Sequence, residues 1–260
     1  MSSHLALIGG EEFADGFEDV HASLLELARQ SRNNGNQRPV QVAFLPTCAS
    51  EDGPEVVEYW CELAKSRLEA LGAEVDSLRI VDQKSANDPQ NAECIARADW
   101  IYFGGGYPHV GLRILGGSQA LQALETARQR GALIAGASAG AMMMCSTAWV
   151  ITPEMDAAIN AYFSGWTSEF NWDISLPPLL DGLGLLPHSM CWPHANQFFS
   201  LAWLKAGLLP PGHRLIGIDE QTALVTSGQN RWQVLGRGKV TLVNDRIEVQ
   251  EFPSSAQLNF

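Results

Sequence analysis

Short apolar runs alternate with longer amphipathic segments through the first half of the chain. The apolar runs have the length of buried strands, whereas the segments between them carry apolar residues at three- and four-residue spacing, as helices do. Strands separated by helices of this length predict βαβ units and a mostly parallel sheet with helices on both faces. The predicted strands cover residues 5–8, 40–45, 74–80, 100–103 and 131–135, and the predicted helices cover residues 17–30, 54–71, 91–98 and 115–130.

The pattern changes after residue 148. Residues 148–182 are rich in Trp, Phe, Pro and Ser with weak periodicity, which predicts an excursion over the face that carries the candidate site. A helix is predicted over residues 195–206. Short strands and turns follow from Arg214, at residues 215–218, 222–226, 232–235, 240–243 and 247–252. We interpret them as an antiparallel extension of the same sheet, so that residues 1–260 form a single α/β domain with a doubly wound, mostly parallel sheet.

Composition narrows the class of protein. A chain of 260 residues with 46% hydrophobic content can bury a full core. The formal net charge of −12 argues against a nucleic-acid partner, which requires a basic surface. No apolar run approaches the roughly 18 residues of a membrane helix, and the first residues lack the pattern of a signal peptide. The five cysteines show no CxxC spacing, which is typical of reduced thiols, and we expect a cytoplasmic protein.

The stretch Gly136-Ala137-Ser138-Ala139-Gly140 lies between a predicted buried strand and a predicted helix that begins with Ala141. A G-x-S-x-G sequence in that context predicts a nucleophile elbow, in which a sharp turn exposes the serine hydroxyl. Small flanking residues are needed because larger side chains would collide with the neighbouring strand or helix. The helix N-terminus would also place N–H groups beside a developing oxyanion. The alternative is a tightly packed strand-to-helix turn without chemistry.

A serine nucleophile needs a base within hydrogen-bond reach. His194 stands where a strand-like segment meets a predicted helix, the place where α/β folds present side chains. His188, six residues earlier, is the rival candidate. A metal site formed by His188, Cys191 and His194 is a further alternative, although no fourth ligand matches it. The expected site therefore contains no metal and no cofactor.

The base also needs an orienting acid, and Asp219 and Glu220 stand at a tight turn between two apolar segments. Neighbouring residues of an extended segment point to opposite sides, so only one of the two carboxylates faces the imidazole. The residue types alone leave the choice between them open.

Three glycines, Gly104, Gly105 and Gly106, follow the predicted strand 100–103. Backbone N–H groups of Gly105 and Gly106, together with that of Ala139, would form an oxyanion hole, since glycine places no side chain in the way. The alternatives are a phosphate-binding loop or a plain turn. Neither G-x-G-x-x-G nor the P-loop lysine is present, which disfavours nucleotide binding.

Together these motifs resemble peptidase family S51, which contains aspartyl dipeptidase (peptidase E) and cyanophycinase. The resemblance covers nearly the whole chain and rests on the sequences LIGG at 7–10, FGGG at 103–106, GASAGA at 136–141, GLGLLP at 182–187 and GIDEQTALV at 217–225. It implies a fold like that of class I glutamine amidotransferases, with Ser138 in place of their cysteine. It also implies that His194 is the catalytic histidine and Glu220 the triad acid, acting on a small peptide or isopeptide.

Departures from the cyanophycinase pattern bear on the substrate. The sequence Gly106-Tyr107-Pro108-His109 replaces Asp-Gln after the glycines, and Trp192-Pro193 replaces Asp-Gln before the histidine. We therefore expect an aromatic, less polar pocket that selects a short substrate with an apolar portion. The candidate substrate-binding residues are Tyr107, His109, Arg113 and Trp192, with Trp166 and Trp172 as further pocket aromatics.

Two other functions are kept open by the sequence. An α/β-hydrolase esterase would also carry G-x-S-x-G, but in that fold the acid precedes the histidine, which would require Asp173 or Asp181. A catalytically inactive relative that binds a peptide or a protein partner is compatible with the altered glycine loop and with Trp192-Pro193 before the histidine. The assembly that we consider for this chain is a homodimer.

Overall fold

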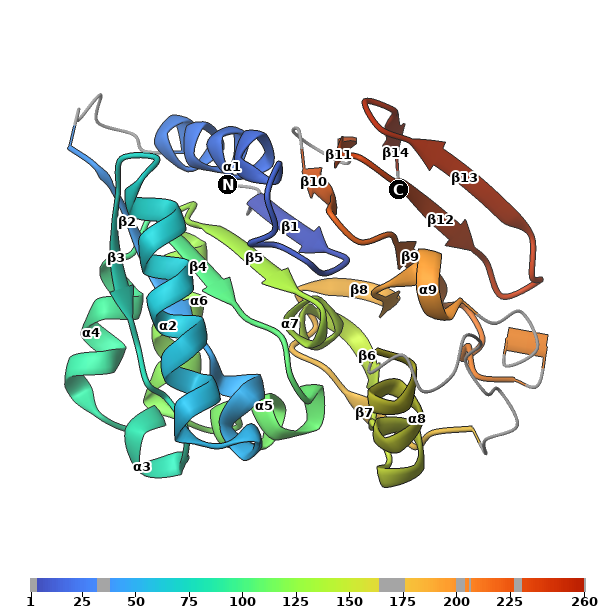
Figure 1. Cartoon of the computed structure of the whole chain (residues 1–260), viewed down its shortest axis with the longest axis horizontal. Coiled ribbons are helices and arrows are strands. Elements are labelled where there is room, and N and C mark those ends of the chain that lie inside the picture. The colour runs from blue at the N-terminus through green and yellow to red at the C-terminus, as the bar shows by residue number, and fades with distance from the viewer. Residues whose placement is uncertain are drawn as a thin grey trace.

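The computed structural model describes residues 4–31, 38–163, 176–199, 204–205, 207–226 and 231–259. Figure 1 shows the chain as two sheets with helices packed around the first of them. Within the described ranges, no helix has the length and apolar character needed to cross a bilayer.

The first sheet has eight strands in the order β14-β11-β10-β1-β5-β4-β2-β3. Five of them pair in parallel, as the alternating pattern predicts: β1 (His4–Ile8), β2 (Val40–Leu45), β3 (Ala73–Ser77), β4 (Trp100–Phe103) and β5 (Leu133–Ala137). Three antiparallel strands extend this sheet beyond β1: β10 (Thr222–Thr226), β11 (Arg231–Gly236) and β14 (Gln257–Asn259). The predicted antiparallel extension is therefore present at this edge.

A second sheet holds the other C-terminal strands. Its order is β13-β12-β9-β8-β6-β7, with β6 (Cys145–Trp149), β7 (Leu179–Asp181), β8 (Leu186–Trp192), β9 (Arg214–Ile218), β12 (Lys239–Val243) and β13 (Val249–Pro253). The prediction of a single sheet is wrong for these strands. Alternation along a sequence identifies a strand but not its neighbour, and β9 pairs with β8 and β12 instead of with the first sheet.

Helices cover both faces of the first sheet, as Figure 1 shows. Helices α1 (Glu18–Gln30) and α2 (Pro54–Glu69) pack with Ala6 and Ile8 of β1 in one core. Helices α4 (Pro89–Arg97), α5 (Pro108–Leu115), α6 (Gln119–Gln129) and α7 (Ala139–Met144) pack with Leu5 and Leu7 in the other. Alternate residues of one strand thus point to opposite cores, which confirms the doubly wound α/β architecture.

Several boundaries differ from the predicted ones. The helix predicted over 115–130 is α6, which begins later than predicted because the chain turns at Gly116 and Gly117 and Ser118 then caps it, accepting a hydrogen bond from the Leu121 N–H at 3.2 Å. Helix α5, which ends at Leu115, was not predicted. The helix predicted over 195–206 is described as α9 (Ala195–Phe198), since Phe199 has extended backbone. The structure also adds a 3-10 helix, η1 (Thr47–Asp52), and helices α3 (Gln83–Ala86) and α8 (Pro153–Phe163).

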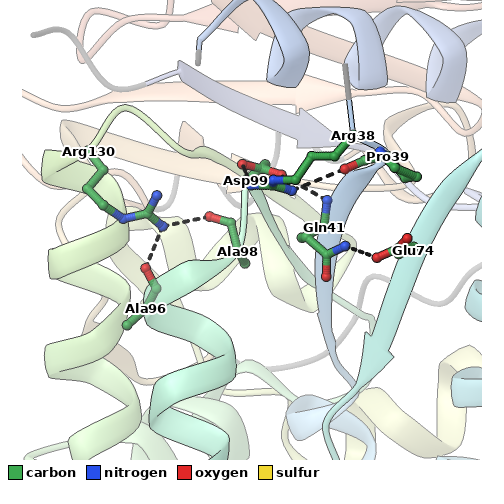
Figure 2. Close-up of polar contacts among 8 residues, drawn as sticks. All are labelled: Arg38, Pro39, Gln41, Glu74, Ala96, Ala98, Asp99 and Arg130. Carbon is green, nitrogen blue, oxygen red and sulfur yellow. Dashed lines mark hydrogen bonds and ion pairs between the residues drawn. The ribbon is translucent and has the colours of Figure 1, made fainter. Parts of the chain in front are cut away.

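A polar network joins the amino ends of the parallel strands (Figure 2). The buried Asp99 carboxylate accepts two hydrogen bonds from Arg38, at 2.7 and 2.9 Å, and a third from the Gln41 N–H at 2.9 Å. Arg130 donates to the carbonyls of Ala96 and Ala98, which precede β4. This network fixes the end of the sheet opposite to the loops described next.

Candidate active site

Ser138 lies at the junction between β5 and α7, with φ 50° and ψ −116°. A β-carbon on Gly136 would lie 2.4 Å from the carbonyl carbon of Gly140, and one on Gly140 would lie 2.5 Å from the carbonyl oxygen of Phe103. Strand and helix are thus so close that only glycine fits at both positions, as the motif predicts. The Ser138 N–H donates to the Ile8 carbonyl at 3.0 Å, which fixes the turn against the end of β1.

His194 comes two residues after β8 and is the residue before α9, in a left-handed conformation with φ 52° and ψ 38°. Its backbone N–H donates to the carbonyl of Gly9 at 2.8 Å, so the loop after β1 holds it in place. Its Nε2 lies 3.0 Å from Ser138 Oγ. The imidazole is therefore within hydrogen-bond distance of the serine hydroxyl.

Glu220 completes the arrangement from the turn between β9 and β10. One carboxylate oxygen, Oε1, lies 2.9 Å from His194 Nδ1, and the other accepts a hydrogen bond from Gln197 Nε2 at 3.2 Å. The hydrogen bond with His194 lowers the pKa of Glu220, which keeps the carboxyl ionised. The Glu220 N–H in turn donates to Asn196 Oδ1 at 2.9 Å.

Asp219 points away from His194. Its carboxylate accepts a hydrogen bond from the Lys239 N–H at 3.0 Å, and its own N–H donates to the Lys239 carbonyl at 3.2 Å. Burial raises the pKa of Asp219. Of the two acids left open by the sequence, Glu220 is therefore the one that contacts the imidazole.

His188 is exposed in the first half of β8, and its ring packs against that of His213 with centroids 5.8 Å apart. His188 therefore packs against His213, and the imidazole that contacts Ser138 is that of His194. Cys191 is buried, and among the described residues no group of three His, Cys, Asp or Glu side chains is arranged to hold a metal ion.

The glycine loop after β4 lies against the serine. A β-carbon on Gly105 would lie 3.4 Å from Ser138 Cβ and 3.8 Å from its Oγ. The loop is fixed by hydrogen bonds from the Gly104 N–H to Leu45 at 3.0 Å and from the Tyr107 N–H to Cys48 at 2.8 Å. Gly105 therefore lies beside the serine, Gly106 lines the same cavities, and Ala139 follows it in the chain; their role as oxyanion donors stays a prediction.

A cavity of about 220 Å³, here called the apolar cavity, opens on one side of Ser138. Its lining is mostly apolar and includes Met142, Trp149, Ile151, Met155, Ile159, Trp192, Pro193 and Phe198. The rings of Trp149 and Trp192 meet edge to face at 4.6 Å. Tyr107 also lines the cavity, and its hydroxyl donates to Asp156 at 2.9 Å. Two of the predicted substrate-binding residues, Trp192 and Tyr107, therefore border the site.

A larger cavity of about 600 Å³, here called the acidic cavity, lies on another side of the same serine. Carboxylates of Glu11, Glu12, Asp52 and Glu220 line it, beside Phe13, Tyr59, Trp60 and Leu63. Sequence reasoning missed Glu11, Glu12 and Asp52, because a single acidic residue in a loop or at the end of η1 matches no motif. For Glu11 and Glu12, the position directly after Gly9-Gly10 is the sequence signal that could have placed them near the site.

His109 and Arg113 line neither of these cavities among the described residues. Arg113 forms an exposed ion pair with Glu51 at 2.6 Å, and the His109 ring packs 5.8 Å from that of Tyr107. Both lie on α5, and their contact with substrate stays a prediction. Trp166 and Trp172 lie outside the described residues.

Known proteins resemble this chain along most of its length. Cyanophycinase from Geminocystis herdmanii (strain PCC 6308) is 25% identical over 252 residues, covering 94% of this chain and 81% of the relative. Cyanophycinase from Trichormus variabilis (strain ATCC 29413 / PCC 7937) is 30% identical over 182 residues. That second alignment covers 68% of this chain and 55% of the relative, so the chain matches about half of its length.

Solved structures agree with these relatives. A peptidase from an acI-B1 Actinobacterium superposes with a TM-score of 0.81 at 27% identity, covering 100% of this chain and 98% of the other. A putative peptidase E protein from Listeria monocytogenes EGD-e superposes with a TM-score of 0.57 at 19% identity over 98% of this chain and 100% of the other, a likeness of fold alone. The sequence pattern of peptidase family S51 matches residues 5–234, and this chain therefore belongs to that family.

Proposed function

We propose that this member of the peptidase family is an active serine hydrolase that cleaves a small peptide or isopeptide through Ser138, His194 and Glu220. The observation that supports this best is the pair of contacts at one imidazole, 3.0 Å to the serine hydroxyl and 2.9 Å to the carboxylate. A carboxylate on Nδ1 favours the tautomer that carries its proton there, which leaves Nε2 free to accept the serine proton.

In the proposed mechanism, Ser138 Oγ attacks the scissile carbonyl while His194 Nε2 takes its proton. The N–H groups of Gly105, Gly106 and Ala139 then stabilise the oxyanion of the tetrahedral intermediate. His194 returns the proton to the leaving amine, which departs and leaves an acyl-enzyme. Water, deprotonated by the same imidazole, hydrolyses the ester. Glu220 stabilises the imidazolium at both stages.

The proposed substrate is a short peptide with an apolar or aromatic portion. The apolar cavity beside Ser138 supports this, because Trp149, Trp192 and Met155 would bury such a group. Cyanophycin is the natural comparison substrate, given the names of the relatives. We also propose a cytoplasmic location, supported by five free cysteines, four of them buried.

Fluorophosphonate labelling tests the nucleophile directly, since only an activated serine reacts. We expect wild-type protein to label and Ser138→Ala and His194→Ala to fail, with His188→Ala as the matched control that labels normally. Turnover is then measured on a library of dipeptides, aspartyl and isoaspartyl ones included, and on cyanophycin. Ser138→Ala is expected to lose several orders of magnitude in kcat. An unlabelled wild type would favour an inactive binding protein instead.

A further inference from the structure

The acidic cavity has an unbalanced charge. Four carboxylates line it, and no lysine or arginine is among its described lining residues. Two of the four have protein partners: Glu220 contacts His194, and Glu11 accepts a hydrogen bond from Gln221 Nε2 at 3.0 Å. Asp52 lies at the junction with the apolar cavity, and burial raises its pKa. The fourth carboxylate is that of Glu12.

Glu12 is 4% exposed, and it lies on the wall of a cavity that also reaches Ser138. Its carboxyl is hydrogen-bonded to its own backbone N–H, and in the described part of the chain no other residue donates to it. Burial raises the pKa of Glu12 and outweighs the opposing effects of its own backbone N–H and of the charge on His194. A substrate cation in the cavity would add to the effect of His194 and further favour the ionised carboxylate of Glu12.

We propose that Glu12 determines specificity by binding a cationic group of the substrate, an ammonium or a guanidinium, in the acidic cavity. The inference rests on the proposed function, because it takes Ser138 as the point of cleavage. Gly106, Ser138 and His194 border both cavities, so a substrate held at the serine has access to each of them. Its apolar portion would occupy the apolar cavity while its cation pairs with Glu12. A second carboxylate on the substrate would be repelled.

Binding to the Ser138→Ala variant tests this without turnover. Three ligands are compared by calorimetry: Leu-Phe-amide, N-acetyl-Leu-Phe-amide and N-acetyl-Lys-Phe-amide. The first carries an α-ammonium, the second no cation and the third a side-chain ammonium. Each is titrated into Ser138→Ala, Ser138→Ala/Glu12→Gln and, as the matched control, Ser138→Ala/Glu11→Gln.

Glu12→Gln is expected to weaken a cationic ligand by roughly ten- to a hundredfold, the value of a charge-assisted hydrogen bond, and to leave the neutral ligand unchanged. The control Glu11→Gln is expected to change little. Loss for Leu-Phe-amide alone identifies an α-ammonium site, and loss for the lysine ligand alone identifies a side-chain site. Equal weakening of all three ligands, no weakening, or no binding of either cation would overturn the proposal.

Labelling separates this proposal from the proposed function. With Ser138 present, Glu12→Gln should react with the fluorophosphonate at the wild-type rate. If wild-type protein labels but Glu12→Gln labels more slowly, Glu12 positions His194, and this result would contradict a role in substrate binding. An unreactive wild type would contradict the proposed catalysis, while the calorimetric comparison would still decide the role of Glu12.

Discussion

A β-carbon on Gly10 would lie 2.2 Å from Cε1 and 2.7 Å from Nδ1 of His194. The loop after β1 therefore packs directly on the imidazole, and the absence of a side chain at Gly10 is what lets the ring reach both Ser138 and Glu220. The same residue accepts a hydrogen bond from the Gln221 N–H at 2.9 Å, next to Glu220.

Gly10→Ala should displace the His194 ring and lower kcat/KM by at least about a hundredfold, since a displacement of about 1 Å can have that effect on catalysis. Kinetics and fluorophosphonate labelling measure the change. Gly72→Ala is the matched control, because Gly72 also has positive φ, at 83°, but a β-carbon there meets nothing within 4 Å. Equal activity losses in the two variants would contradict a specific effect of the collision with His194.

Glu220→Gln should reduce kcat by roughly two to four orders of magnitude, because a neutral amide no longer stabilises the imidazolium or enforces its tautomer. Asp219→Asn should retain most of the activity and lower the free energy of unfolding by about 1 kcal/mol, through its weakened hydrogen bond with the Lys239 N–H. Steady-state kinetics and urea unfolding distinguish the two effects. The reverse ranking in kcat would transfer the orienting role to Asp219.

His21 should make the fold sensitive to mild acid. Burial lowers its pKa to about 4, among Phe17, Trp100 and Tyr102, whereas an unfolded histidine has a pKa of about 6.5. Between those values the unfolded chain binds a proton that the folded chain does not. Stability from this residue is therefore lost as the pH falls from about 6.5 to about 4, by at most about 1.4 kcal/mol per pH unit.

Urea unfolding at a series of pH values measures this effect. In His21→Gln the free energy of unfolding should decline less steeply than in wild type across that window. Parallel profiles for the two proteins would exclude His21 as the source of the acid sensitivity.

Asp99→Asn should lower the free energy of unfolding by about 1–3 kcal/mol and leave kcat/KM unchanged. The substitution removes the charge that holds Arg38 and the Gln41 N–H (Figure 2), at the end of the sheet away from Ser138. Glu74→Gln, at the exposed partner of the Gln41 side chain, is the control and should change stability little. A fall in activity for Asp99→Asn at a temperature where it remains folded would contradict this separation.

The sequence predicts the elements around Ser138 well, because its signals there are local. A buried strand, a small-residue turn and a helix specify the junction, and the spacing of apolar residues specifies the parallel strands. The order of Ser138, His194 and an acid is also readable from the chain. Each of these inferences depends on residues that are near one another in sequence.

Features that depend on distant contacts were not predictable. Gly9 and Gly10 resemble any strand-ending glycines, since the ring that excludes a side chain at Gly10 comes from residue 194. Arg113 has the charge to bind an acidic group of a substrate, but it forms an ion pair with Glu51, which lies in η1. The choice of sheet for β9 likewise depends on its pairing with β8, which alternation does not encode.

The division of the chain between two sheets has a consequence for how the site forms. Ser138 lies where the chain leaves β5 of the first sheet for β6 of the second, and Glu220 lies where it returns from β9 to β10. His194 comes two residues after β8 of the second sheet and is anchored to Gly9, which follows β1 of the first. Neither sheet contains the triad alone. Hydrolysis should therefore be lost as soon as the two sheets separate, even while each sheet retains its own hydrogen bonds. On gradual denaturation, turnover should fall before circular dichroism shows a loss of secondary structure.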